Sequence, residues 1–174
     1  AFDGDADRCF VVDERGELVN PSTLTGLIAT QELQRVPGAP VIHNVITSRA
    51  VPEIIAENGG VPVVTRVGHS FIKETMAQTG AVFGGEHSGH FYFADFWRAD
   101  SGMLAALHVL SRLSNTPDGT TASELLAPYE RYVLSGEINT KVADQAAAIA
   151  AVREHFTGQD VTFSDLDGLT VDGG

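Results

Sequence analysis

Apolar and polar positions along the chain follow two periods, one typical of helices and one typical of strands. Leu24, Leu27 and Ile28 recur at the three- and four-residue spacing of a single helix face, which predicts a helix at 21–34. Short β-rich runs bounded by Pro and Gly predict strands between such helices. The pattern predicts strands at 9–12, 41–46, 62–66, 81–84 and 90–94, and helices at 21–34, at 70–78, from a Ser48 cap to Glu57, and from an Asp100 or Ser101 cap, where Met103, Leu107, Leu110 and Leu113 recur at helical spacing.

The order of these elements indicates the fold class. Pro37-Gly38 ends the first helix and Asn58-Gly59-Gly60 ends the second, so strands and helices alternate with short connections. Such alternation predicts a parallel sheet covered by helices. We therefore expect an α/β fold with a mixed, largely parallel sheet.

The pattern changes after the turn-rich run at 115–119. A short helix at 121–126 is followed by a hinge at 128–132, and then by a strand at 133–142, a helix at 144–156 and short strands. These elements predict the start of a second, smaller α+β domain.

Composition and charge exclude several classes of partner. A formal net charge of −12 argues against broad binding to nucleic acid or to anionic membranes, which needs a basic face. No apolar run approaches the roughly 20 residues of a membrane span. The single cysteine, Cys9, cannot form an internal disulfide and is compatible with the reducing cytoplasm.

The first loop with candidate chemistry is Asp3-Gly4-Asp5-Ala6-Asp7-Arg8, here called the acidic loop. Its three carboxylates alternate with small residues and can converge on a hard cation, for which Mg²⁺ fits better than Ca²⁺. The spacing also allows an EF-hand with Glu14 at its twelfth position, or a solvated acidic turn. Arg8 at the position that requires Gly, and the β-like run that follows, oppose the EF-hand.

The second loop, Arg66-Val67-Gly68-His69-Ser70, lies between a predicted strand end and a predicted helix start. Unpaired N–H groups and the helix dipole favour an anion at such a position. An ordinary strand-to-helix turn with a Ser cap explains the same residues.

The third loop, residues 84–90, is here called the histidine loop and reads Gly84-Gly85-Glu86-His87-Ser88-Gly89-His90. Glu86 and Ser88 can accept and donate hydrogen bonds to adjacent sugar hydroxyls, and His87 or His90 can move a proton near neutral pH. A zinc site is an alternative, although no cysteine is nearby. So dense a polar cluster favours binding or catalysis over a plain turn.

The fourth loop, Trp97-Arg98-Ala99-Asp100-Ser101-Gly102, begins a helix, and ordinary capping explains it. All four loops are nevertheless expected at the carboxyl ends of strands or the starts of helices. This is the edge at which open α/β sheets bind ligands, so their coincidence carries more weight than any one loop.

Together these segments resemble the α-D-phosphohexomutase family, in its phosphomannomutase/phosphoglucomutase form. The acidic loop matches the family's magnesium loop. Gly68-His69-Ser70-Phe71-Ile72-Lys73 resembles its phosphosugar-contact segment, and Gly85 to His90 resembles its sugar-recognition loop. The resemblance extends over nearly the whole chain, in order and with similar spacing.

The resemblance implies an isomerase that acts as an intramolecular phosphotransferase of carbohydrate metabolism. A phosphoserine would pass its phosphoryl group to mannose or glucose 1-phosphate, and a hexose 1,6-bisphosphate intermediate, also the activator, would return the other phosphate. It also implies roles for eight residues: Asp3, Asp5 and Asp7 as Mg²⁺ ligands, Arg8 beside the reacting phosphate, His69, Glu86 and Ser88 as sugar-binding residues, and His90 as the proton-transfer residue.

By the same resemblance, residues 1–18 close domain 2, residues 19–129 form the sugar-recognition domain 3, and residues 130–174 begin domain 4. The phosphoserine loop would precede Ala1 and a phosphate-clamping loop would follow Gly174. We therefore expect the chain to be an internal fragment, inactive alone, whose partners are hexose phosphates and the missing domains of the same protein.

One departure and two alternatives qualify the resemblance. Ile46 stands where many relatives carry Lys, so that Arg49 supplies the contact or the contact is lost. Phosphoglucosamine mutase is one alternative, disfavoured because its loop tends to carry Gln in place of His87. A non-catalytic module that binds a sugar phosphate or a metal is the other.

Overall fold

The computed structural model describes all residues from Ala1 to Gly174. The chain divides into two compact units, which are described separately below. Unit 1 comprises residues 1–132 and unit 2 comprises residues 133–174. No helix in either unit is both long enough and apolar enough to cross a membrane.

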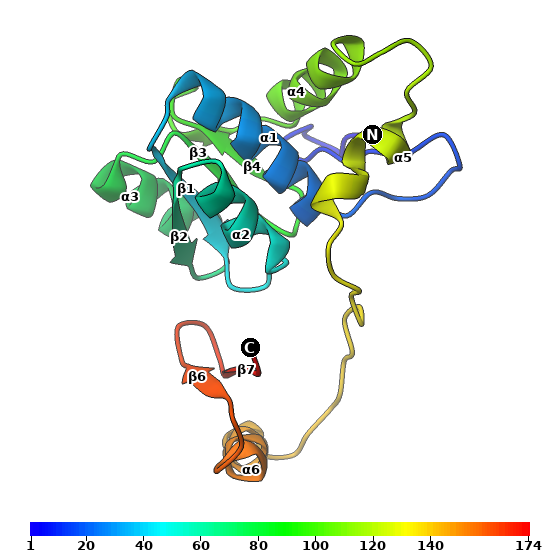
Figure 1. The fold of residues 1–174 in the computed structure, drawn as a ribbon. Coiled ribbons are helices and arrows are strands. Elements are labelled where there is room, and N and C mark those ends of the chain that lie inside the picture. Colours follow the sequence, from blue (N-terminus) through cyan, green and yellow to red (C-terminus); the bar gives the residue numbers. More distant parts are fainter. The chain divides into compact units, whose positions relative to one another are not determined.

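Unit 1 is built on a five-stranded sheet in the order β2-β1-β3-β4-β5 (Figure 1). The first three strands in this order are parallel, and the last two continue the sheet antiparallel. The prediction of a mixed, largely parallel sheet is therefore confirmed. The strands are β1 (Pro40–Asn44), β2 (Val61–Thr65), β3 (Phe83–Gly85), β4 (Phe91–Phe93) and β5 (Ala99–Asp100).

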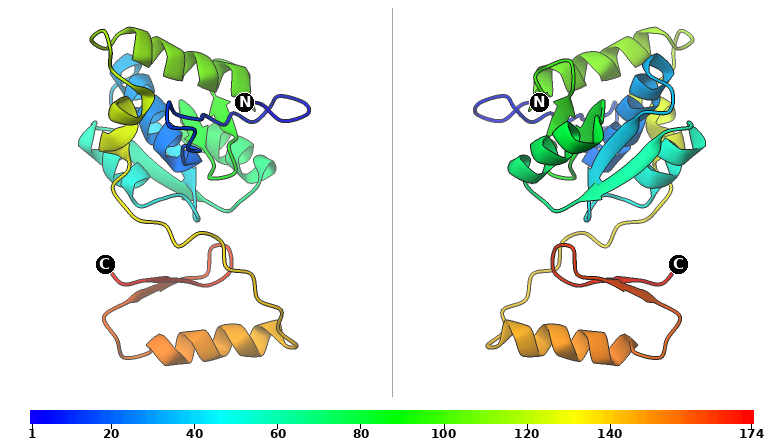
Figure 2. Two further views of the ribbon diagram at one scale, coloured as in Figure 1. Left: turned by 90° about the vertical axis from the view of Figure 1, so that its right-hand side faces the viewer. Right: turned by 90° about the vertical axis from the view of Figure 1, so that its left-hand side faces the viewer.

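Helices cover both faces of this sheet and make a three-layer α/β/α unit (Figures 1 and 2). Helix α1 contacts both α2 and α4, and these three helices share one hydrophobic core with the sheet. Helix α3 packs against strands β1, β2 and β3 through a separate core on the other face. The helices are α1 (Pro21–Arg35), α2 (Ala50–Glu57), α3 (His69–Thr79), α4 (Gly102–Ser114) and α5 (Ala122–Leu126).

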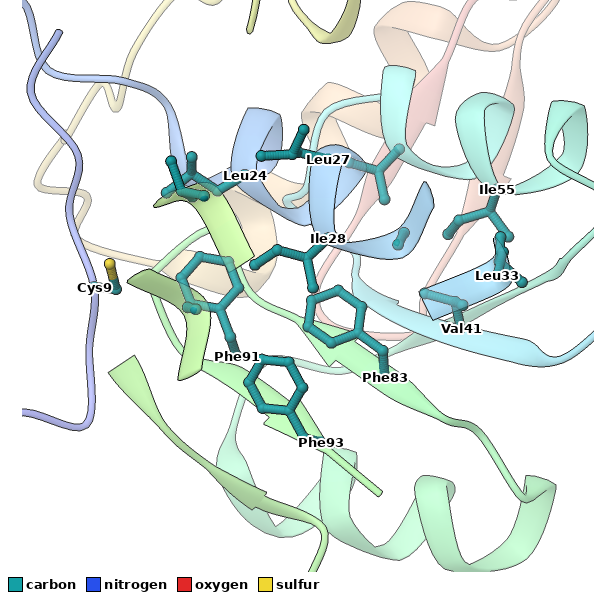
Figure 3. Close-up of a cluster of buried hydrophobic side chains, with 14 of the residues drawn as sticks. Cys9, Leu24, Leu27, Ile28, Leu33, Val41, Ile55, Phe83, Phe91 and Phe93 are labelled. Carbon is teal, nitrogen blue, oxygen red and sulfur yellow. The ribbon is translucent and has the colours of Figure 1, made fainter. Parts of the chain in front are cut away.

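Alternation along the strands divides the apolar side chains between the two cores. In β1, Val41 belongs to the core under α1, whereas its neighbour Ile42 belongs to the core under α3. Phe91 and Phe93 of β4 likewise face α1, and Tyr92 between them faces α3. Figure 3 shows the phenyl rings of Phe83, Phe91 and Phe93 gathered beside Ile28 of α1. Full burial of each such side chain contributes about 1.5–3 kcal/mol.

The predicted helices are all present, with small shifts at their ends. Leu24, Leu27 and Ile28 are fully buried, as their spacing indicates. Helix α4 differs, because Ala105 and Val109 form its buried face while the stripe that begins with Met103 is largely exposed. The exposed members of this stripe are Met103, Leu107 and Leu110.

Residues 1–18 of unit 1 have no regular structure, and the strand predicted at 9–12 is wrong. The segment makes isolated bridges, including one between Arg8 and His90 and one between Val12 and Leu18. Since a strand needs an adjacent strand along its length, single bridges do not extend into a ladder. The buried Cys9 side chain and the hydrogen bond of Glu14 to Ser123 hold the segment in place.

Unit 1 ends in α5, a 3₁₀ turn at Ala127–Tyr129 and two residues bound to α2. The guanidinium of Arg131 binds Glu57 through two hydrogen bonds of 2.7 and 2.6 Å. The hydroxyl of Tyr132 donates to Glu53 at 2.5 Å.

Unit 2 contains helix α6 (Gln145–Phe156), capped by Asp144, and an antiparallel hairpin of β6 (Thr162–Ser164) and β7 (Thr170–Asp172). The strand predicted at 133–142 is wrong, since this segment is irregular. Its backbone has no strand of unit 2 beside it, because β6 and β7 pair with each other.

Candidate functional site

Three parallel strands end at the same edge of the sheet, and polar side chains gather there. Asn44 ends β1, Thr65 ends β2, and the histidine loop follows β3. The acidic loop reaches the same place through the bridge between Arg8 and His90. The backbone of the loop also lies against the start of α4. A Cβ added to Gly102 would be only 2.5 Å from the carbonyl oxygen of Arg8, so the close approach requires glycine.

The acidic loop brings its three carboxylates together. One oxygen each of Asp3, Asp5 and Asp7 lies within 4.8 Å of the others. Asp3 is already engaged, because Arg8 Nε donates to its Oδ2 at 2.6 Å and the Arg8 N–H donates to its Oδ1 at 3.3 Å. Partial desolvation raises the pKa of Asp3, but the bonds from Arg8 outweigh it, and the pKa lies below its usual value.

The carboxylates of this loop fit a hard cation. Oδ1 of Asp7 is buried and has no hydrogen-bond partner in the protein. A buried carboxylate oxygen without a donor is costly, and a bound cation would satisfy it. Oxygen-only ligands on a short loop suit Mg²⁺ better than a transition metal.

Glu86 is the most heavily bonded carboxylate of the site. It is 2% exposed, and its Oε1 accepts from the Gly68 N–H at 3.1 Å and from Asn44 Nδ2 at 3.3 Å. Its Oε2 accepts from the Tyr92 hydroxyl at 2.8 Å. The N-cap residue of α3 therefore donates its N–H to a buried carboxylate of the protein itself. About four acceptor positions exist on a carboxylate, so the three protein donors leave roughly one for a ligand.

Tyr92 connects Glu86 to His69. Its hydroxyl lies 2.8 Å from His69 Nδ1 as well as 2.8 Å from Glu86 Oε2. Burial, followed by the charge of Glu86, raises the pKa of Tyr92 well above its ordinary value. The hydroxyl thus keeps its proton and donates a hydrogen bond to Glu86. The hydrogen of the bond to His69 is therefore supplied by the imidazole.

His90 lies where the acidic loop and the histidine loop meet. It is 8% exposed, and its Nδ1 is 3.0 Å from Asp100 Oδ2 and 3.7 Å from Asp7 Oδ1. The β3–β4 turn fixes its backbone, because the Glu86 N–H donates to the His90 carbonyl at 2.9 Å. The ring of His69 packs edge-on against it, with centroids 4.3 Å apart.

The remaining positions of the histidine loop lie at the tip of this turn. His87 Nδ1 lies 3.1 Å from the hydroxyl of Ser22, which also accepts from the N–H of Ser48 at 3.2 Å. Ser88 is half-buried beside it. Ile46, at the position where the resemblance leads us to expect Lys, is 55% exposed.

The fourth loop turns one residue outward and another inward. Trp97 and Arg98 adopt left-handed backbone angles, with φ of 54° and 56°, and the Trp97 side chain is 85% exposed. Asp100 points inward and forms an ion pair with Lys73, whose Nζ is 3.3 Å from Oδ1. Ser101, not Asp100, caps α4 by accepting from the Leu104 N–H.

Sequence reasoning missed Asp100, Tyr92 and Asn44 as members of this cluster. The sequence offered Asp100 only as one of two alternative helix caps. The adjacent Ser101 can take the cap instead, and this is the signal that Asp100 is available for another role. Tyr92 reads as a core residue of an aromatic strand. Its hydroxyl, on the α3 face of β4, is the feature that gives it a polar role.

The chain is similar to known proteins over nearly its whole length. A family model described as phosphoglucomutase/phosphomannomutase, α/β/α domain III, matches residues 20–132. A phosphomannomutase of Vibrio cholerae serotype O1 is 39% identical over 172 residues, which are 99% of this chain. A phosphomannomutase of Escherichia coli K12 is 38% identical over 171 residues.

A solved structure is similar over the same range. A phosphoglucomutase/phosphomannomutase family protein of Burkholderia thailandensis superposes with a TM-score of 0.78 at 33% identity, over 99% of this chain. The chain spans 37% of the length of the Vibrio and Escherichia relatives and 36% of the Burkholderia protein.

Proposed function

Because the chain belongs to the phosphoglucomutase/phosphomannomutase family, we propose that it is the cation-binding and sugar-recognition part of a phosphohexomutase. The full-length protein would interconvert the 1- and 6-phosphates of mannose or glucose. The observation that carries this proposal is the meeting of the acidic loop and the histidine loop at His90, which lies 3.7 Å from Asp7 at the ligand-binding edge of the sheet.

The proposed reaction has two halves. A phosphoserine from another part of the full-length protein transfers its phosphoryl group to a hexose 1-phosphate, which gives a hexose 1,6-bisphosphate. The other phosphate then returns to the serine, leaving the hexose 6-phosphate. Positioning and charge neutralisation dominate the barrier of such transfers, so a preformed polar cluster is what the protein must supply.

In this proposal Asp3, Asp5 and Asp7 hold Mg²⁺, which when bound offsets charge on the transferring phosphoryl group. The orphaned Oδ1 of Asp7 supports this assignment. Arg8 lies beside the same phosphate, and its bond to Asp3 keeps the guanidinium in the loop.

Sugar recognition falls to His69, Glu86 and Ser88. Glu86 has about one acceptor position left, which suits a single sugar hydroxyl, and Ser88 at the turn tip can serve the neighbouring hydroxyl. The 3- and 4-hydroxyls are common to mannose and glucose, so binding there admits both sugars. His90 exchanges a proton with the reacting hydroxyl.

The proposal also includes binding partners and a location in the cell. Hexose phosphates and the remaining domains of the same protein are the partners that we propose. A location in the cytoplasm agrees with the free thiol of Cys9, the one cysteine of the chain.

The test is the mutase activity of the full-length protein with Mg²⁺ and a trace of hexose 1,6-bisphosphate. Values of kcat/KM are compared for mannose 1-phosphate, glucose 1-phosphate and glucosamine 1-phosphate. A preference for mannose or glucose supports the proposal. Dominant activity on the glucosamine ester replaces the substrate assignment, and no activity on any of the three favours a binding module.

A further inference from the structure

Asp100 is a charged residue of the site to which the proposed function gives no role. It ends β5, its side chain is 9% exposed, and three cationic or imidazole groups surround it. His90 Nδ1 is 3.0 Å from its Oδ2, His69 Nδ1 is 3.5 Å from the same oxygen, and Lys73 Nζ is 3.3 Å from its Oδ1.

This carboxylate fixes which nitrogen of His90 carries a proton. Desolvation opposes the ionised form of Asp100, but its own backbone N–H, Lys73 and His90 outweigh that effect and lower its pKa. An ionised carboxylate only accepts hydrogen bonds, so the hydrogen between the two groups belongs to His90 Nδ1. Asp7 Oδ1, at 3.7 Å, is beyond hydrogen-bond distance. The lone pair of the neutral imidazole therefore lies on Nε2.

The backbone of His90 is already held by the β3–β4 turn, but the turn does not fix rotation of the ring. Asp100 fixes it from one side through Nδ1, and the ring of His69 packs against it from another. A base held in one rotamer and one tautomer is what efficient proton transfer requires.

We propose that Asp100 is a positioning residue that orients His90 and keeps its Nε2 as the proton acceptor for the reacting sugar hydroxyl; this rests on the proposed function. As the hydroxyl oxygen bonds to phosphorus, the phosphorus–oxygen bond to the serine breaks and its electron pair leaves with the serine oxygen. The hydroxyl proton passes to Nε2. In the reverse half, the imidazolium returns that proton to the sugar oxygen as it leaves phosphorus.

Two other roles explain Asp100 less well. A helix cap is excluded, because Ser101 already accepts from the Leu104 N–H at the start of α4. His69, His90 and Asp100 have ligand atoms within 4.8 Å of one another and resemble a transition-metal site. The ion pair of Lys73 with Asp100 and the bond of His69 Nδ1 to Tyr92 oppose a cation there.

The kinetic test is a double-mutant cycle in the full-length protein with Asp100→Asn, His90→Ala and both together. Asparagine is nearly isosteric but can present its amide hydrogens to Nδ1, which favours the wrong tautomer. We expect Asp100→Asn to lower kcat about 10²-fold or more with a much smaller change in KM. In the His90→Ala background it should cost almost nothing further, since its effect passes through His90.

The matched control is Asp95→Asn, an exposed carboxylate on the same β4–β5 connection, paired with Arg35. It should leave kcat and KM unchanged. Losses that multiply in the double mutant, or an Asp100→Asn enzyme with wild-type kcat, overturn the inference while the function stands. A wild-type enzyme without mutase activity overturns the proposed function and this role together.

A second measurement needs neither activity nor a tolerated variant at Asp100. The chain has six histidines, so ¹⁵N-histidine labelling of the 174-residue chain gives a simple imidazole spectrum, and the His90→Ala spectrum identifies His90. At a pH where the ring is neutral, we expect its proton on Nδ1. A proton on Nε2 in the wild-type chain overturns the inference.

Discussion

Units 1 and 2 differ in whether their apolar side chains are buried. Unit 1 contains every buried residue of the chain, whereas no residue of unit 2 is buried, although α6 and its hairpin carry Ile149, Val152 and Phe163. Helix α6 is well capped and the hairpin is paired, so local structure is not what unit 2 lacks. A core forms where two layers close over a sheet face, and unit 2 has one helix and two short strands.

The difference matters for function, because the whole candidate site lies in unit 1. Three of the four loops start or end at an element of the buried sheet or at a helix packed on it, and the acidic loop is bridged to His90. A polar cluster whose geometry must hold to a fraction of an ångström needs such rigid support. Changes in the core of unit 1 should therefore affect its fold and the site together, whereas changes in unit 2 should leave both unaltered.

The largest expected difference comes from truncating the core. Phe83 is 0% exposed in β3, and Phe83→Ala should lower the free energy of unfolding by about 3–5 kcal/mol through lost burial and a cavity. Val152→Ala in α6, where the side chain is 45% exposed, should change it by no more than about 0.5 kcal/mol. Urea unfolding followed by hydrogen exchange measures both. Similar losses for the two variants would contradict the comparison.

The second effect links the fold of unit 1 to its site. Glu86→Gln replaces an acceptor oxygen with an amide that faces donors from Gly68, Asn44 or Tyr92. We expect a loss of about 1–3 kcal/mol in stability, together with a lower kcat/KM in the full-length protein. Thermal unfolding and mutase kinetics are measured on the same variant. The control is Glu137→Gln in unit 2, an exposed residue that should change neither quantity.

The third effect concerns the cation. Asp5→Asn removes one of three converging carboxylates and should weaken Mg²⁺ binding at least tenfold, which is about 1.4 kcal/mol. Isothermal titration of the chain with Mg²⁺ provides the affinity without any substrate. Asp160→Asn in unit 2 is the matched control. An unchanged affinity in Asp5→Asn would remove the acidic loop from the metal assignment.

A smaller effect is the pH dependence of the stability of unit 1. Burial lowers the pKa of His43 on β1 and of His108 on α4, both in unit 1. Below the unfolded value near 6.5 the unfolded chain binds protons that the folded unit does not, so stability falls as the pH decreases from about 7 to 5. Equilibrium unfolding across this range measures the slope, and His43→Gln should flatten it. A steeper slope in His43→Gln would contradict the assignment.

The smallest effect is local to the end of unit 1. Arg131→Met removes the double hydrogen bond to Glu57, an exposed pair that contributes little to global stability. Amide exchange of residues 129–132 should increase severalfold, whereas exchange in β1 and β3 should not change. Hydrogen-exchange mass spectrometry resolves these segments. Faster exchange throughout unit 1 would show that the Arg131–Glu57 pair supports the whole fold.

Periodicity predicted the helices and the sheet of unit 1 because each element there buries one face. The stripe on α1 is fully buried, and strands β1 to β4 lie within a few residues of the predicted positions. The same reasoning failed at 9–12 and 133–142, where β-rich composition exists without an adjacent strand. Pairing partners depend on topology, which local composition does not contain.

In the candidate site, the sequence indicated residue types and loops but not the contacts between them. Spacing placed Asp3, Asp5 and Asp7 on one loop, and density of polar residues singled out Glu86 and His90. It could not show that Glu86 is enclosed by donors from β1, the N-cap of α3 and β4, because these segments meet only in the folded unit. Asp100 was missed for the same reason.

The tight β3–β4 turn has a consequence for protein engineering and divergence. Glu86 and His90 are joined across it by the bond of the Glu86 N–H to the His90 carbonyl, and the Gly89 N–H closes it onto the Glu86 carbonyl. The two outer residues are thus locked in register, while His87 and Ser88 at the tip are free of that constraint. Residues 87 and 88 can therefore be exchanged without moving the groups on either side, whereas a single inserted residue would separate them.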